Sequence, residues 1–333
     1  MRVLYVVPQG PAGTASMVFA HSEIDRIAAS GVSTAVFPFR SSIRPDVLFR
    51  QILSIRSRIR EFHPDIVHAH FGTMTAFATV LAADVPVIIT FRGSDLNPSP
   101  ADGWIRNTVQ NILSNTAAKS AKGVILVSRQ LRSRLWFEHP NAHVIPTGVD
   151  LDAFKPSGRI EAREKLGWSF NDPVVLFNAG LSPEVKRLDL AEQAVGLLRQ
   201  RVPTVRMHVL DGRTPHQELP LYMNAADCLM VTSDFEGSPD IVKEALASNL
   251  PIVSVDVGDV KERTSGVTGV EIVARDPQAI ASAAERIINS ANRSNGREKI
   301  AELDSNRIRD AVIQVYAEIL GREFRNREQV SPD

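Results

Sequence analysis

The sequence DFEGSPDIVKEALA at residues 234–247 decides the fold, because it marks a helix that begins directly after a strand. The strand is the apolar run Cys228–Thr232, which is short and bounded by polar residues. Ser238 is a good N-cap, and Pro239 has the φ angle and missing N–H suited to the first helical position. Asp240 complements the positive end of the helix dipole. We therefore expect a helix that starts at this point.

Two glutamates flank the start of this helix. The helix is expected to end at Asn249, which tolerates the left-handed conformation, because Pro251 cannot continue it. In a parallel sheet its N-terminus lies at the carboxyl edge, where open α/β folds bind ligands. Glu236 lies in the loop at that edge, and Glu244 lies just over one turn into the helix. Such carboxylates suit the hydroxyls of a sugar or ribose, although an ordinary surface helix with two incidental acids is the alternative.

Short apolar runs alternate with longer amphipathic stretches along the whole chain, which is typical of βαβ units in a parallel sheet. In the first half the expected strands are Val3–Val7, Thr34–Phe39, Asp65–His70, Val85–Phe91, Gly123–Ser128 and His143–Pro146, with helices at about 15–30 and 45–62. In the second half they are Val174–Asn178, Arg206–Leu210, Cys228–Thr232, Ile252–Val257 and Gly269–Val273. The pattern lapses at 155–173, which reads as a linker. We predict an α/β protein with two Rossmann-like doubly wound domains, 1–155 and 156–304.

Composition and charge exclude several classes of protein. The 333 residues are 44% hydrophobic and 23% charged, which are globular values. A net charge of zero argues against nucleic acid as a partner. Residues 1–155 nevertheless hold 16 Lys and Arg against 11 Asp and Glu, and the rest holds 22 against 27. One cysteine, Cys228, allows no internal disulfide. The N-terminal apolar run is too short for a signal peptide, so a cytoplasmic location is expected.

The segment EGSPDIVKEALASNLPIVSVDVGD, residues 236–259, resembles the signature of the retaining glycosyltransferases of family four, with its two glutamates eight positions apart. Members of that family have the GT-B fold, in which two Rossmann-like domains face each other across the reaction cleft. The resemblance implies that Glu244 holds the nucleotide ribose and that Glu236 lies beside the donor sugar. The donor-binding residues implied on this segment are Glu244, Gly237, Ser238, Pro239 and Asp240.

The segment NAGLSPEVKR, residues 178–187, resembles the phosphate-binding loop of the same family. There an arginine and a lysine usually bind the diphosphate, and the lysine corresponds to Lys186. Leu181 stands where the arginine usually follows Gly180, so Arg187 is the candidate substitute. We predict catalytic roles for Lys186, Arg187 and Glu236, unless the two cations merely begin a solvated helix.

Two segments of the first domain also resemble the family. In TFRGSD, residues 90–95, Arg92 replaces the common histidine, and Asp95 is either a donor contact or a structural turn residue. His68 and His70 close a strand and, with a period of two, face the same side. No third metal ligand is evident in the sequence, so no metal site is predicted. One histidine is expected to pack, and His70 to border the cleft as a further catalytic residue.

The remaining motifs concern the acceptor, the domain entry and the termini of the domains. Gly10 and Gly13 lie in the loop after the first strand, which would face the acceptor. Their spacing does not match a dinucleotide-binding motif, so a nicotinamide cofactor is disfavoured. Asp150-Leu-Asp152 has the spacing of a metal-binding D-x-D motif, but it lies where the chain enters the second domain in this family, and we interpret it as interdomain structure. The amphipathic segment 305–333 is expected to cross back to the N-terminal domain, as the final helix does in GT-B proteins.

The basic and apolar segment 44–62 has two interpretations. Its arginines and apolar residues suit a helix lying on a membrane surface. The alternative is a helix that buries an apolar stripe on the sheet while arginine stems cover the rest. Membrane contact would make the protein peripheral on the inner membrane face and would explain the positive N-terminal half.

The resemblance thus implies a metal-independent, retaining glycosyltransferase of the hexosyltransferase class in bacterial-type glycan assembly. Its partners are a nucleotide-sugar donor, which serves as co-substrate in place of any cofactor, and a glycan or lipid-linked acceptor. Closure of the two domains would exclude water from the reacting centre. One alternative is a GT-B sugar-nucleotide epimerase. The other is a catalytically inactive GT-B binding subunit, which Leu181 and Arg92 make conceivable because they replace residues that are usual in the family.

Overall fold

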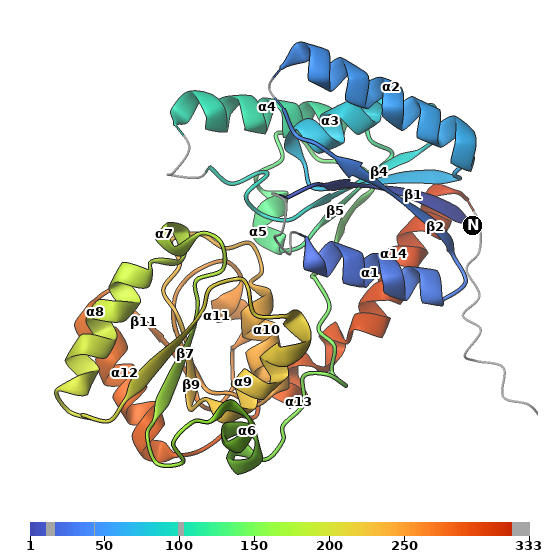
Figure 1. Ribbon diagram of the computed structural model, residues 1–333. Helices are drawn as coiled ribbons and strands as arrows, with labels where there is room; N and C mark the ends of the chain where they lie inside the picture. The colour runs from blue at the N-terminus through green and yellow to red at the C-terminus, as the bar shows by residue number, and fades with distance from the viewer. Residues whose placement is uncertain (11–16, 43, 99–102, 322–333) are drawn as a thin grey trace, which may run out of the picture. The chain divides into compact units, whose positions relative to one another are not determined.

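The computed structural model describes residues 1–10, 17–42, 44–98 and 103–321 (Figure 1). Its described residues divide into two compact units, the first from 1–146 and 306–321, and the second from 147–305. The boundary after Pro146 lies earlier than the expected one at residue 155. The reason is a parallel bridge between Val149 and Asp304, in which Val149 N donates to Leu303 O at 2.9 Å and so joins the entry segment to the second unit.

The first unit is a six-stranded parallel sheet with the order β2-β1-β3-β4-β5-β6. The strands are β1 Arg2–Pro8, β2 Ser33–Phe39, β3 Ile66–His70, β4 Val87–Phe91, β5 Gly123–Leu126 and β6 Ala142–Val144. The helices are α1 Val18–Ala29, α2 Pro45–Phe62, α3 Thr73–Ala82, α4 Trp104–Ser120, α5 Arg129–Arg132 and α14 Ser305–Ile319.

Helices cover both faces of this sheet, so its strands are apolar on both sides. Leu4 and Val6 of β1 face the core formed with α2, α3 and α4, whereas Val3, Tyr5 and Val7 face the core formed with α1 and α14 (Figure 1). Helix α14 comes from the C-terminal part of the chain and buries its apolar face against strands of the N-terminal sheet.

The second unit is a five-stranded parallel sheet with the order β11-β10-β9-β7-β8. The strands are β7 Val174–Asn178, β8 Arg206–Leu210, β9 Cys228–Val231, β10 Ile252–Val255 and β11 Val270–Val273. The helices are α6 Arg159–Leu166, α7 Pro183–Lys186, α8 Leu188–Arg199, η1 His216–Glu218, α9 Leu219–Ala225, α10 Asp240–Ala247, α11 Val260–Arg263, α12 Pro277–Ser290, α13 Gly296–Ile300 and η2 Ala301–Leu303. Helices α8 and α12 lie on one face, and α9 and α10 on the other (Figure 1).

The predicted α/β class with two doubly wound sheets is confirmed. Each expected strand is present within a few residues of its expected bounds, because the runs are apolar, β-branched and delimited by polar residues. Among the described helices, none has a stretch long and apolar enough to cross a bilayer.

Candidate functional site

The carboxyl edge of the second sheet carries the predicted donor-binding helix, α10, after β9. The helix begins at Asp240 and not at Pro239, so the prediction of a Ser238 N-cap was wrong. Instead, Ser238 Oγ donates to Oδ2 of Asp259 at 2.8 Å, and Pro239 occupies the N-cap position. The predicted helix end is confirmed, since Asn249 has a φ angle of 53°. The Asp240 carboxylate lies 2.7 Å from Nζ of the buried Lys243, which also donates to a backbone carbonyl.

Glu244 is buried on α10 and already has a hydrogen-bond partner. Its Oε1 lies 2.7 Å from Nε2 of His216, and the Glu244 residue is only 7% exposed. Burial raises the pKa of Glu244, and the hydrogen bond to Glu244 raises the pKa of His216. Sequence reasoning missed His216, because it follows β8 in η1 and no motif connects it to α10.

Glu236 and Lys186, which come from two separate motifs, lie in contact. Lys186 Nζ donates to Glu236 Oε1 at 2.6 Å, and Ser233 Oγ donates to the same oxygen at 2.7 Å. Lys186 ends α7, after β7, whereas Glu236 follows β9, the neighbouring strand. Both side chains are partly exposed, at 24% for Lys186 and 13% for Glu236. A cation and a carboxylate therefore border the sheet edge, each with some access to solvent.

Arg187 lies beside Lys186, but its guanidinium is engaged by two carboxylates. Its Nε and Nη2 donate to the two oxygens of Asp189, each at 2.9 Å, and Nη1 lies 3.3 Å from Asp234 Oδ1. The hydrogen bond to Asp189 raises the pKa of Arg187. Arg275, which sequence reasoning missed, donates from Nη1 to Asp234 Oδ1 at 2.8 Å and to two backbone carbonyls of the same loop. These contacts fix the loop after β9, and they leave Arg187 poorly placed as a substitute phosphate ligand.

Gly180 adopts the backbone conformation that the loop after β7 requires. Its φ angle is +53°, and its N–H donates to Leu210 O at 3.1 Å and to Asn178 Oδ1 at 3.2 Å. Leu181, at the position of the missing arginine, is 56% exposed. An exposed leucine in the predicted phosphate-binding loop supplies no charge there.

In the first unit, Asp95 orders the loops that follow β3 and β4. Its carboxylate accepts backbone N–H bonds from Gly72 at 2.8 Å, Gly93 at 2.8 Å and Arg92 at 3.1 Å, and the residue is 1% exposed. Burial raises the pKa of Asp95, and these backbone donors oppose the rise. Of the two interpretations left open by the sequence, the contacts favour the structural turn residue.

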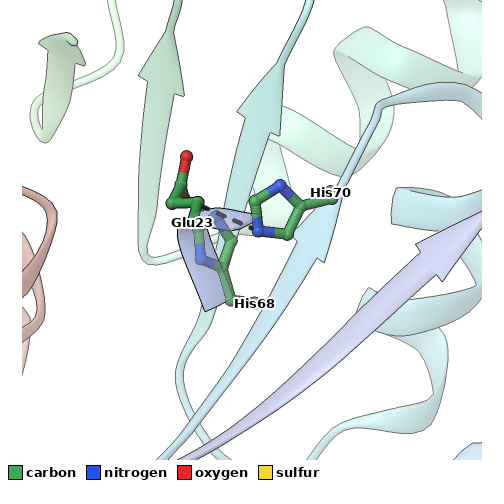
Figure 2. A group of neighbouring side chains, drawn as sticks. All are labelled: Glu23, His68 and His70. Carbon is green, nitrogen blue, oxygen red and sulfur yellow. Dashed lines mark ion pairs between the residues drawn. The ribbon is translucent and has the colours of Figure 1, made fainter. Parts of the chain in front are cut away.

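Arg92 contacts both Glu23 and His70. Figure 2 shows these two partners, Glu23 and His70, beside each other. Arg92 Nη2 lies 3.2 Å from Glu23 Oε2 and 2.8 Å from His70 Nδ1, and its guanidinium stacks on Phe19 at 4.6 Å. Burial lowers the pKa of His70 well below its usual range. Since arginine only donates, the neutral His70 accepts at Nδ1, and its Nε2–H faces Glu23 Oε1 at 3.7 Å. His70 is fully buried, and the catalytic role expected for it stays a prediction.

His68 packs beside His70, as expected, with ring centroids 4.5 Å apart. Its Nδ1 lies 2.6 Å from the Tyr316 hydroxyl and its Nε2 lies 2.7 Å from Thr90 Oγ1. Burial lowers the pKa of His68 to about 3. Glu23 is the third potential metal ligand that the sequence did not reveal, because it comes from α1. Both nitrogens of His68 are bonded and the Arg92 cation adjoins the group, so the arrangement suits a hydrogen-bonded network better than a divalent ion.

Gly10, Asp150 and Gly237 lie in loops and turns of the described residues. Gly10 ends the described part of the loop after β1, and Gly13 lies outside the described residues. Asp150 Oδ1 accepts the backbone N–H groups of Asp152 and Ala153, each at 3.0 Å, which makes the Asp150-Leu-Asp152 segment a turn. Gly237 precedes Ser238 in the loop before α10, and its carbonyl oxygen packs against the backbone of Gly258.

Two family models match the chain. The model for "Glycosyltransferase Family 4" matches residues 9–153, and the model for "Glycosyl transferases group 1" matches residues 208–290. Together the matches fall in both units, which agrees with the motifs found in each half.

Several curated proteins with similar sequences are glycosyltransferases. TuaC of Bacillus subtilis, assigned to teichuronic acid biosynthesis, is 26% identical over 68% of this chain. A GDP-mannose-dependent alpha-mannosyltransferase of Mycobacterium tuberculosis is 26% identical over 77% of this chain and 71% of its own length. A D-inositol 3-phosphate glycosyltransferase of Xylanimonas cellulosilytica is 27% identical over 65% of this chain. The chain spans 62% of the length of TuaC and 61% of the length of the Xylanimonas protein.

Solved structures share the fold over almost the whole chain. The sucrose-phosphate synthase of Thermosynechococcus elongatus has a TM-score of 0.77 at 16% identity and covers 96% of this chain and 100% of its own. Anabaena Alr3699/HepE, solved in complex with UDP, has a TM-score of 0.70 at 18% identity, with the same coverage of both chains. The UDP-GlcNAc 2-epimerase of Methanocaldococcus jannaschii has a TM-score of 0.63 at 12% identity and likewise covers 96% and 100%. At these identities the likeness defines the fold alone.

Proposed function

Because the chain belongs to glycosyltransferase family four and has the GT-B fold, we propose that it transfers a sugar from a nucleoside-diphosphate sugar to a glycan or lipid-linked acceptor. The observation that carries the proposal is the contact between Lys186 and Glu236 beside α10, because it joins the two motifs at one sheet edge. Anabaena HepE was solved with UDP, and this fits a nucleotide-sugar donor here. The second unit binds the donor in this scheme, and the first unit serves the acceptor.

Retention of the anomeric configuration and independence of divalent metal are parts of the same proposal. The departing diphosphate gains negative charge as the glycosidic bond breaks, and preorganised donors stabilise that charge. Lys186 supplies a cation, and the positive end of α10 supplies N–H groups without partners inside the helix. Glu236 orients the donor sugar, and Glu244 accepts the ribose hydroxyls.

The test begins with thermal shifts in the presence of UDP, GDP, ADP and their sugars, followed by calorimetry with the nucleotide that stabilises most. The Glu244→Ala variant should bind that nucleotide about tenfold or more weakly, because a charge-assisted hydrogen bond contributes about 1.5–3 kcal/mol. Glu218→Ala, which removes an exposed acid of η1, is the control. Unchanged affinity in Glu244→Ala would contradict the ribose role.

Product analysis separates the alternatives. A transferase needs the acceptor, whereas an epimerase changes the donor alone. The epimerase alternative is tested because the Methanocaldococcus epimerase has the same fold as this chain. Nucleotide binding without turnover of any donor would favour the inactive binding subunit. That alternative is worth testing because the exposed Leu181 replaces the usual arginine and the buried side chain of Arg92 replaces the usual histidine.

A further inference from the structure

If the second unit binds a nucleoside diphosphate, as proposed above, the diphosphate needs a cation that carboxylates do not already neutralise. Lys186 is paired with Glu236 at 2.6 Å, and Arg187 is bound by Asp189 through two hydrogen bonds. Leu181 adds no charge at the loop after β7. The cations predicted from the sequence are therefore partly or fully engaged in the free protein.

The loop at residues 211–216, after β8, is fixed at both ends beside the proposed contacts of the donor. At its start, Gly212 has a φ angle of +82°, and a Cβ atom there would lie 3.0 Å from Leu181 Cδ2 and 3.1 Å from the carbonyl carbon of Gly180. At its end, Nε2 of His216 lies 2.7 Å from Oε1 of Glu244. The loop therefore runs from the proposed phosphate contact to the proposed ribose contact.

Arg213 extends from this loop between the two fixed ends. Its side chain is 88% exposed, and its Nε lies 3.7 Å from Asp211 Oδ2, which is too long for a hydrogen bond. An exposed ion pair of this kind contributes little, so Asp211 does not hold the guanidinium firmly. The fork of arginine N–H groups matches phosphate oxygens and can bind them in pairs.

We propose that Arg213 binds the diphosphate of the donor and takes the part of the arginine that Leu181 replaces. The two positions lie in the loops after different strands, β8 and β7, but they are close in space because Gly212 packs directly on Gly180 and Leu181. A side chain on residue 212 would separate them, so the glycine is needed for the approach. Arg213 thus supplies, from the adjacent loop, the positive charge that Leu181 does not provide.

The experiment is calorimetry with a nucleoside, its monophosphate and its diphosphate, using the base that the unmodified protein prefers. Arg213→Ala should weaken diphosphate binding by about tenfold to a hundredfold and leave nucleoside binding unchanged, since only the phosphate contact is lost. Arg213→Lys should lose less. Arg206→Ala is the matched control, because Arg206 is an exposed arginine at the other end of the same strand, and it should bind the diphosphate normally.

A rescue variant makes the test specific. Leu181→Arg in the Arg213→Ala background should restore most of the diphosphate affinity, which a general loss of loop structure would not allow. Equal weakening of nucleoside and diphosphate by Arg213→Ala would overturn the phosphate role in favour of contact with the base. Normal diphosphate affinity in Arg213→Ala would overturn the proposal while the donor assignment stands. Absence of nucleotide binding by the unmodified protein would overturn both.

Discussion

His216 Nε2 lies 2.7 Å from Glu244 Oε1, so the carboxylate proposed to hold the ribose is occupied by a side chain in the free protein. We expect a nucleotide to displace this imidazole when its ribose hydroxyls bind Glu244. The hydrogen bond to Glu244 raises the pKa of His216, and the carboxylates of Asp240 and Asp150 act in the same direction. Displacement therefore becomes easier once His216 loses its proton.

We predict that nucleotide affinity rises as the pH increases above about 6.5, the ordinary pKa of histidine. Because the pKa of His216 is raised, the charged His216–Glu244 pair is fully formed at lower pH. It is lost as the pH rises through this raised pKa. Release of one proton limits the gain to about tenfold per pH unit. Calorimetry from pH 6 to 9 measures it. His216→Ala should bind more tightly at pH 6 and lose the pH dependence, and His143→Ala, the control, should keep it. A flat profile in the unmodified protein would contradict the displacement.

The sequence could not reveal this pair, although it predicted Glu244 itself. Glu244 belongs to a motif whose spacing on a helix is fixed, whereas His216 reaches it from the loop after β8. The same holds for Arg275, which follows β11 and binds carbonyl groups in the loop after β9. Periodicity predicts which strand a residue follows, but it does not predict which neighbouring loop its side chain will contact.

The error at the start of α10 has a similar cause. Ser238 has the right chemistry for an N-cap, but its hydroxyl donates a hydrogen bond to a carboxylate from the loop after β10. Local preference was thus overridden by a tertiary contact of Asp259. The strands of both sheets, by contrast, could be predicted because burial on two faces leaves continuous apolar runs in the sequence.

Tyr316 should stabilise the first unit through its hydroxyl group. The hydroxyl lies 2.6 Å from His68 Nδ1 and 3.1 Å from the Tyr5 hydroxyl, in a fully buried position. We predict that Tyr316→Phe lowers the free energy of unfolding by about 1–3 kcal/mol, because a buried polar partner is left unsatisfied. Urea denaturation measures the change. Tyr222→Phe, whose ring stacks on His208, should change stability by under about 0.5 kcal/mol. Equal effects of the two variants would show that the hydroxyl network contributes little.

Membrane contact by α2 stays a prediction with new structural support. The helix exposes Phe49 at 62% and Leu53 at 43% beside its arginines. Each basic residue near an anionic surface contributes about 1 kcal/mol. Replacing Arg50, Arg56 and Arg60 with glutamate should abolish cosedimentation with anionic vesicles at low salt. Neutral vesicles provide the control, and failure of the unmodified protein to bind anionic vesicles would end the hypothesis.

The last prediction concerns Lys186 and the charge of the leaving diphosphate. Lys186 is paired with Glu236 in the free protein, whereas the donor offers it a diphosphate whose negative charge grows during the reaction. Loss of one preorganised donor to a developing charge typically lowers turnover by about 10²–10³, so Lys186→Ala should have that effect while the protein stays folded. Arg187→Ala should lower turnover less, because its guanidinium is bound to Asp189 and Asp234.

Steady-state kinetics with the preferred donor, together with NMR of the product, measure these effects. If Arg187 had taken over the diphosphate, both variants would be impaired alike, and the carboxylate contacts of Arg187 argue against that result. Lys186→Arg should keep more activity than Lys186→Ala, since it preserves the charge. Full turnover in Lys186→Ala, an inverted anomer, or activity that EDTA abolishes and Mg²⁺ or Mn²⁺ restores would each contradict the scheme. The metal result would do so most directly, because a bound cation would perform the neutralisation that is assigned here to the side chain and to the N-terminus of α10.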